Sequence, residues 1–368
     1  MKKILSIVLV LIFALLISAG CSAPAEPEAP AEPAAPAVGE GSVIKLGLGH
    51  ITSIAKSSDF GKDAEGKEIL PSGQVDTVMA AVGFDKDGRV VSVTIDNAQT
   101  KVTFDAALQV TSDIKAEGKT KVELKEEYGM IKGSSIGKEW YQQAEALGEW
   151  MVGRTVNEIK AMKTVEKDAL HPAVPDEAEL TSLVTISVQD CIAAVAEAYE
   201  TAIDVTGGVK VGLGHVISTS KSQGIGKDAE GKEALPFAQV DTVMTAAAFD
   251  KDGKVVGTVI DNAQTKVTFD NTGKVTSDKG AEYQTKVELK EKYGMIKGSS
   301  IGKDWYQQAE ALGKWMVGRT VNEIKAMKTV EKDASHPAVP DEAELTSLVT
   351  ISVQDYIAAV AEAYANAK

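Results

Sequence analysis

Two threonines, Thr185 and Thr350, are the residues whose sequence context most favours a chemical role. Each ends a segment that the chain contains twice, beginning at Glu179 in the first copy. Downstream, Ser187 and Asp190 have the spacing of a capping box, which predicts a β-branched strand running into a helix. Thr185 would then precede a helix N-terminus, where unpaired backbone N–H groups and the helix dipole favour a bound phosphate. The same local pattern is also that of a helix cap without a ligand.

The repeated segment resembles the flavinylation motif of FMN-binding domains. In that motif two residues separate an acidic residue from a Ser or Thr, and two more separate the latter from a final Thr. In that family a flavin transferase of the ApbE type esterifies the final Thr with the phosphate of FMN. The resemblance therefore implies two phosphoester-linked FMN groups. It assigns the acceptor threonines and their motif partners as Thr185, Ser182 and Glu179 in the first copy, and Thr350, Ser347 and Glu344 in the second.

A second resemblance covers essentially the whole mature chain. The segments that start at Tyr128 (Tyr-Gly-Met-Ile-Lys-Gly-Ser-Ser) and at Trp140 (Trp-Tyr-Gln-Gln-Ala) are similar to PplA-type lipoproteins of Gram-positive extracellular electron transfer. This resemblance implies an electron carrier on the extracellular face of the cell membrane, rather than a stand-alone enzyme. Electrons would arrive from a membrane quinone-linked donor and leave to extracellular acceptors such as ferric iron.

Two other classes of protein stay open. A lipid-anchored module could bind a small molecule or a cell-wall component without redox activity, and a surface structural or adhesion protein would also use tandem repeats. Both treat the motif as helix capping alone. Only the electron carrier predicts a yellow protein whose absorbance survives denaturation.

Residues upstream of the motif are candidates to contact a flavin ring. A polarizable side chain can pack on the ring and a cation can stabilise its reduced anionic form. These candidates are Met130, Lys132, Met295 and Lys297, for which core or surface roles explain the sequence equally well. Residues 133–138 lack the spacing and the Ser/Thr of a P-loop, which excludes nucleotide hydrolysis. A turn that donates N–H groups to a flavin phosphate stays open there.

The first 21 residues have the pattern of a lipoprotein signal peptide. Lys2 and Lys3 precede an apolar run that is too short for a transmembrane helix, and small residues lead to Cys21 as in a bacterial lipobox. Acyl chains on Cys21 would anchor the protein to a membrane. Residues 22–40 are rich in Ala, Pro and Glu, so we expect an extended tether there.

The rest of the chain is one sequence that occurs twice, with a constant offset that relates Thr185 to Thr350. We expect two FMN-binding domains, residues 41–205 and 206–368, joined by a short linker at the glycine pair 207–208. Alternation predicts strands in the first half of each copy, including one at residues 122–124. The Asp-Gly pairs that end at Gly88 and Gly253 predict hairpin turns. Helices follow, one with Trp140 and Leu147 on its buried face, and the next opened by a capping box from Thr155 to Glu158. The predicted fold class is α+β, with a mainly antiparallel sheet and packed helices in each copy.

Composition and charge exclude several functions. The formal net charge of −14 argues against nucleic acid as a partner. The histidines do not have the spacing of metal ligands, so the sequence predicts no metal site. They are His50, His171, His215 and His336. His50 could edge a flavin pocket or be a structural histidine. Cys191 aligns with Tyr356 of the second copy, so we expect no disulfide framework.

Overall fold

The structure, a computed structural model, describes residues 43–227 and 230–368 of the chain. The expected signal peptide at 1–21, with Cys21, and the expected tether at 22–40 lie outside the described residues. The described residues lie in one compact unit that contains both repeats.

Each repeat is built on long antiparallel strands. In the first repeat the sheet order is β5-β4-β1-β8, and in the second it is β13-β12-β9. The strands are β1 (Val43–Ser53), β4 (Ser72–Phe84), β5 (Val90–Thr103), β8 (Ile203–Gly208), β9 (Lys210–Ser218), β12 (Phe237–Phe249) and β13 (Val255–Thr268). The β4–β5 and β12–β13 hairpins turn at Gly88 and Gly253, whose φ angles of 73° and 76° are readily adopted only by glycine. The predicted Asp-Gly turns are confirmed.

Short two-stranded pairings lie outside these sheets. They pair β2 (Gly61–Lys62) with β3 (Glu68–Ile69), β6 (Thr164–Val165) with β7 (Val174–Pro175), β10 (Gly226–Lys227) with β11 (Glu233–Ala234), and β14 (Thr329–Val330) with β15 (Val339–Pro340).

The helices follow the strands in both repeats. The first repeat has α1 (Lys121–Leu124), the 3-10 turns η1 (Lys125–Tyr128) and η2 (Met130–Lys132), α2 (Trp140–Met151), α3 (Val156–Lys160) and α4 (Gln189–Glu200). The second has α5 (Lys286–Leu289), η3 (Lys290–Tyr293), η4 (Met295–Lys297), α6 (Trp305–Met316), α7 (Val321–Lys325) and α8 (Gln354–Ala365). The predicted α+β class is therefore confirmed.

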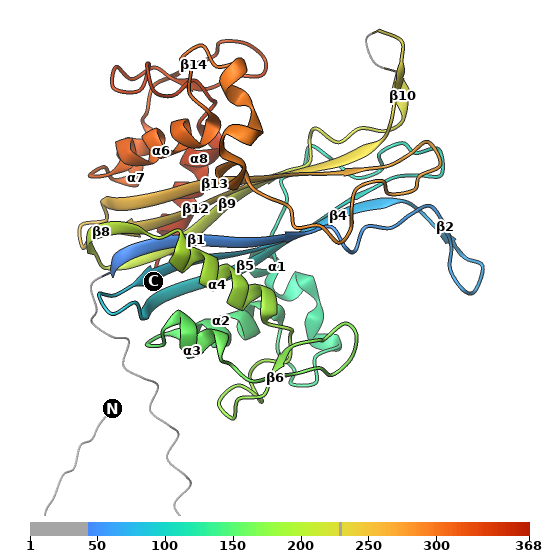
Figure 1. The fold of residues 1–368 in the computed structure, drawn as a ribbon, viewed down its shortest axis with the longest axis horizontal. Coiled ribbons are helices and arrows are strands. Elements are labelled where there is room, and N and C mark those ends of the chain that lie inside the picture. The colour runs from blue at the N-terminus through green and yellow to red at the C-terminus, as the bar shows by residue number, and fades with distance from the viewer. Residues whose placement is uncertain (1–42, 228–229) are drawn as a thin grey trace, which may run out of the picture. The chain divides into compact units, whose positions relative to one another are not determined.

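The two sheets share one core between them. Residues of both repeats interleave in it, and Phe104 meets Phe269 edge to face with ring centroids 5.1 Å apart. On the outer face of each sheet the helices enclose a second core, α2 to α4 in one repeat and α6 to α8 in the other (Figure 1). Trp140 and Trp305 are buried in these outer cores, as predicted. Equivalent residues of the two repeats face each other, as in an isologous dimer interface.

Two glycines allow α4 to lie directly against β1. A Cβ atom on Gly47 would stand 1.8 Å from the carbonyl oxygen of Ala198, and one on Gly49 would stand 1.9 Å from that of Ala194. No other residue type fits at that separation. The close approach brings Glu197 of α4 within reach of His50, the residue after Gly49.

The structure corrects four local predictions. The segment that ends at Thr185 forms consecutive turns rather than a strand, because Leu180 and Val184 are buried four residues apart. Helix α4 begins after Val188, with no side-chain cap, so the predicted Ser187 cap is wrong. The hydroxyl of Ser187 instead accepts the N–H of Ala173 at 3.4 Å.

Residues 121–124 form helix α1 rather than the predicted strand, because Thr120 and Glu123 make a capping box. The glycine pair 207–208 lies within strand β8, which pairs with β1, rather than in a linker. Within the described ranges, no helix has the length and apolar character needed to cross a membrane.

Candidate functional site

Thr185 is held at the surface of the first repeat by a buried glutamine. Its backbone N–H donates to Oε1 of Gln143 at 2.8 Å, and its hydroxyl donates to the same oxygen at 3.3 Å. The next N–H, of Ile186, also donates to it at 3.3 Å. The side chain of Thr185 is half-buried, whereas Gln143 is fully buried. One amide oxygen therefore fixes the backbone on both sides of the Thr185 carbonyl.

Gln143 connects the motif to the loop before α2. Its amide nitrogen donates to the carbonyl of Lys138 at 3.1 Å and lies 3.4 Å from the hydroxyl of Ser134. The second repeat repeats the arrangement, with Thr350 donating to Gln308 at 2.7 Å. Neither glutamine was predicted as a site residue, although a polar residue on the otherwise apolar face of α2 indicates a specific hydrogen-bonding role.

A buried carboxylate positions the candidate ring-contact residue Met130. Glu139, at the N-terminus of α2, accepts the backbone N–H groups of Met130 at 2.8 Å and Ile131 at 3.1 Å. Met130 is half-buried and packs against the outer core, whereas Lys132 is exposed. Their counterparts Met295 and Lys297 have the same environments.

A buried lysine lies under this loop. Nζ of Lys121 is 5.0 Å from the ring centroid of Tyr128 and 5.3 Å from that of Trp140. Burial lowers the pKa of Lys121 to about 8, and it does the same to Lys286 in the second repeat. Cation–π contact with two rings accounts for the tolerance of a cation in this outer core.

Glu179 and Ser182, the motif partners of Thr185, take no part in its described hydrogen bonds. Glu179 is exposed and binds Arg154 at 2.9 Å, and Arg154 stacks on the ring of Trp150 at 3.9 Å. Ser182 is exposed. In the second repeat Glu344 binds Arg319 at 2.8 Å, and Ser347 is exposed. The structure thus joins Thr185 to Gln143, but does not bring Glu179 or Ser182 into the hydrogen bonds of Thr185.

Four backbone N–H groups of the loop at 133–138 are not available to an anion. The backbone N–H groups of Gly133, Ser134, Gly137 and Lys138 all donate to oxygens within residues 130–134. These donors are already satisfied by their own turn, so the suggested role in binding a flavin phosphate is not supported for them.

A surface groove of about 570 Å³ lies beside the motif of the second repeat. Its lining includes Glu344 and Leu348 of the motif together with Trp315, Arg319 and Lys303. This volume is within the range of sites that hold small organic ligands. A large aromatic surface and cations beside the acceptor segment are compatible with a ring and an anionic phosphate.

The hydroxyl of Thr185 has no base to activate it among its described contacts. Its hydrogen-bond acceptor is the amide oxygen of Gln143, which does not take up a proton at neutral pH. Nucleophilic attack by a Thr hydroxyl needs an adjacent base or a metal. The described contacts therefore position the hydroxyl without activating it.

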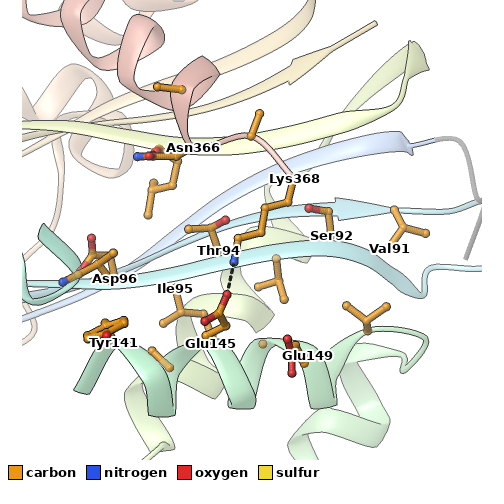
Figure 2. Close-up of a pocket in the computed structure, with 18 of the residues that line it drawn as sticks. Val91, Ser92, Thr94, Ile95, Asp96, Tyr141, Glu145, Glu149, Asn366 and Lys368 are labelled. Carbon is orange, nitrogen blue, oxygen red and sulfur yellow. Dashed lines mark hydrogen bonds and ion pairs between the residues drawn. The ribbon is translucent and has the colours of Figure 1, made fainter. Parts of the chain in front are cut away.

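A larger cavity of about 650 Å³ lies between the two repeats (Figure 2). It is lined by β5 and α2 of the first repeat and by β9 and the C-terminus of the second. At its side, Nζ of Lys368 lies 3.3 Å from Glu145. Asp96 and His215 also line it.

His50 and His215 lie in two equivalent clusters where the repeats meet. His50 is near Glu197 of its own repeat and Glu288 of the other. Burial opposes the charged form of His50, but Glu288 and Glu197 outweigh it and raise the pKa of the imidazole. Asp261 is almost fully buried beside this cluster, and burial raises its pKa. The spacing of residues within one repeat does not predict these clusters, because each cluster contains residues of both repeats.

Taken together, the fold defines an α+β protein of two repeats with one equivalent threonine site in each. No protein-family model, no curated protein and no solved structure matches the chain.

Proposed function

We propose that this protein is a membrane-anchored electron carrier with two FMN groups, each phosphoester-linked to Thr185 or Thr350. A flavin transferase of the ApbE type would attach them. Cys21 would carry the lipid anchor on the extracellular face of the cell membrane. Electrons would pass from a membrane quinone-linked donor to extracellular acceptors such as ferric iron.

One observation carries the proposal. Both threonines are half-buried, and in each repeat the equivalent buried glutamine, Gln143 or Gln308, accepts the threonine N–H, the threonine hydroxyl and the N–H of the next residue. Esterification removes only the hydroxyl proton, so both backbone hydrogen bonds survive it. The framework therefore holds the oxygen in place before and after attachment.

The attachment step exchanges one phosphorus–oxygen bond for another. A P–O bond forms at Oγ1 of the threonine, and the phosphoanhydride bond of a flavin dinucleotide breaks. The threonine proton is released, and a nucleoside monophosphate leaves. Because the contacts of Thr185 provide no base, the transferase must supply one.

Each repeat offers the same candidate surroundings for the bound group. Met130 and Lys132, or Met295 and Lys297, would tune its environment, and the groove at Trp315 would receive it in the second repeat. Flavin accepts electrons singly or in pairs, which suits a relay between a quinone and a one-electron metal acceptor.

The test is the intact mass of the full-length chain produced with and without the transferase. We expect two FMN-sized additions and a visible absorbance that survives denaturation. Thr185→Ala and Thr350→Ala should each remove one addition. Thr181→Ala and Thr346→Ala, which change exposed threonines four residues earlier, should remove none.

An unmodified mass, with a transferase shown to be active on a known substrate, would contradict the proposal. The chain would then be better described as a lipid-anchored module that binds a small molecule or a cell-wall component. If two flavins attach, ferric iron should reoxidise the reduced protein, which the return of its visible absorbance would report.

A further inference from the structure

Each histidine cluster between the repeats draws on three elements. His50 lies on β1 and Glu197 on α4, both in the first repeat, whereas Glu288 lies on α5 of the second. The equivalent cluster reverses the roles, with His215 and Glu362 from the second repeat and Glu123 from the first. The chain therefore has two clusters of the same composition, and neither repeat completes one alone. In the second, Nε2 of His215 faces Glu123 at 3.0 Å and Nδ1 faces Glu362 at 3.2 Å.

The spacing of the donor atoms is that of a metal coordination shell. Nε2 of His50 lies 3.3 Å from Oε2 of Glu288 and 3.5 Å from Oε1 of Glu197. The three ligand atoms lie within 4.8 Å of one another. Bonds of about 2.1 Å in a tetrahedron separate neighbouring ligand atoms by about 3.4 Å. The two distances from the imidazole match this edge.

The histidine of each cluster is buried and faces carboxylates of both repeats. His50 is only 5% exposed, and its Nε2 makes ion pairs with Glu197 and Glu288, although within the described part of the chain neither of its ring nitrogens makes a hydrogen bond of normal geometry. In the second cluster Nε2 of His215 lies 3.0 Å from Oε2 of Glu123, at hydrogen-bond distance. A metal ion would take the place of the proton between the imidazole and the carboxylates.

The charge of the cluster also favours a cation. Two glutamates face His50, and the buried Asp261 lies next to them from β13. Thr285 connects this aspartate to α5, since its hydroxyl donates to Asp261 at 2.7 Å and its N–H to Glu288 at 2.7 Å. The two glutamates thus offer carboxylate oxygens beside the imidazole, and a divalent ion would offset the cost of burying them.

We propose that each cluster binds one divalent transition-metal ion of the Zn²⁺ type, coordinated by one histidine and two glutamates from both repeats. The ligand sets are His50, Glu197 and Glu288, and His215, Glu362 and Glu123. A mixed nitrogen and oxygen set with three protein ligands is typical of zinc and leaves one position for water. Ca²⁺ and Mg²⁺ prefer oxygen ligands alone.

The ligands are oriented before the ion arrives. The N–H of His50 donates to Oε2 of Glu197 at 2.6 Å, which leaves Oε1 facing the ring. The equivalent bond joins the N–H of His215 to Glu362 at 2.7 Å. Such supporting hydrogen bonds fix the orientation of metal ligands. Because one ligand comes from the opposite repeat, the bound ion cross-links the two repeats.

An ion can reach both clusters from solvent. The side chains of Glu197 and Glu288 are 24% and 31% exposed, so the first cluster opens through its carboxylates. The second lies at the wall of the cavity between the repeats, which Asp96 and His215 help to line (Figure 2).

The test is a calorimetric titration of Zn²⁺ into the metal-free full-length chain, produced without the flavin transferase. We expect two ions per chain and a higher Tm with Zn²⁺ present. His50→Gln and His215→Gln should each leave one site, and the double variant should leave none and abolish the rise in Tm. His171→Gln with His336→Gln is the matched control, because these exposed histidines lie outside the clusters and should leave both sites intact.

A second pair of variants keeps the test decisive if the histidine variants do not fold. Glu288→Gln and Glu123→Gln change partly exposed residues without changing their size, and each should weaken one site by about tenfold or more. The proposal is overturned if these variants bind Zn²⁺ as the parent does. It is also overturned if excess Ca²⁺ competes as well as Zn²⁺, or if the parent binds no more ions than the double histidine variant.

Discussion

Thr185 donates its backbone N–H to Gln143, a residue 42 positions earlier in the chain, at 2.8 Å, and Thr350 donates to Gln308 at 2.7 Å. The candidate acceptor threonine of each repeat is thus positioned by a helix that precedes it by a quarter of a repeat, rather than by its own helix cap.

Gln143→Ala should destabilise the first repeat and disturb its threonine site. The N–H groups of Thr185 and Ile186 would lose their acceptor, at a cost of about 1–3 kcal/mol. Urea unfolding should show this loss, and peptide mapping after treatment with the transferase should show less flavin at Thr185 than at Thr350 of the same molecule. Gln189→Ala, an exposed position at the start of α4, is the control. Equal flavin at both threonines would contradict a positioning role.

Glu179→Gln should lower flavin attachment at Thr185 while leaving the free energy of unfolding almost unchanged. Its ion pair with Arg154 is largely exposed, so its loss should cost less than about 1 kcal/mol. If the acidic residue belongs to the motif that a transferase recognises, attachment at Thr185 should fall while Thr350 is modified normally. The two attachment yields, measured on one chain, provide the comparison. Unchanged yield at Thr185 would show that Glu179 serves the ion pair alone.

Gly49→Ala should cost about 3 kcal/mol or more. The new Cβ would stand 1.9 Å from a carbonyl oxygen of α4, so the helix must move from β1. Gly61→Ala is the matched control, because a Cβ at Gly61 meets nothing within 4 Å. Chemical denaturation of the two variants should show a large loss for Gly49 and almost none for Gly61; equal losses would refute the packing argument.

Cys191 should be inert in the folded protein. Burial raises the pKa of its thiol from its usual value near 9 to about 12. Between these values the unfolded thiol ionises and the folded thiol does not, so rising pH favours unfolding. The free energy of unfolding should therefore fall by up to about 1.4 kcal/mol per pH unit above 9. Cys191→Ala should lessen this fall, and a thiol reagent should label Cys191 only after urea is added. Rapid labelling of the folded chain would contradict this burial.

Local patterns predicted much of the fold. The Asp-Gly turn at Gly88, the buried face of α2 around Leu147 and the capping box from Thr155 to Glu158 are all confirmed. Each depends on residues within a few positions of one another, where propensity and periodicity act directly. The same holds for the α+β class, which follows from strands in the first half of each repeat and helices in the second.

Long-range contacts account for what the sequence did not predict. Val122 was expected in a strand, yet its N–H is bound by the carboxylate of Asp96 on β5 at 3.2 Å, which supports α1 instead. The cluster of His50 and Glu288 joins residues of different repeats, so no spacing within one repeat reveals it. The resemblance to a flavinylation motif selected Thr185, but the buried Gln143 that holds it became visible only in the structure.

The core shared by the two sheets requires the two repeats to stay together. A single repeat separated from its neighbour would expose the sheet face that carries Phe104, and would be expected to pair with a second copy of itself. Such a pair would dissociate on dilution. Strand β8 connects the two halves covalently, so each half meets its partner at a high effective concentration that no longer depends on how many molecules are present. The duplicated chain thus keeps the dimer-like contact between its repeats at any protein concentration.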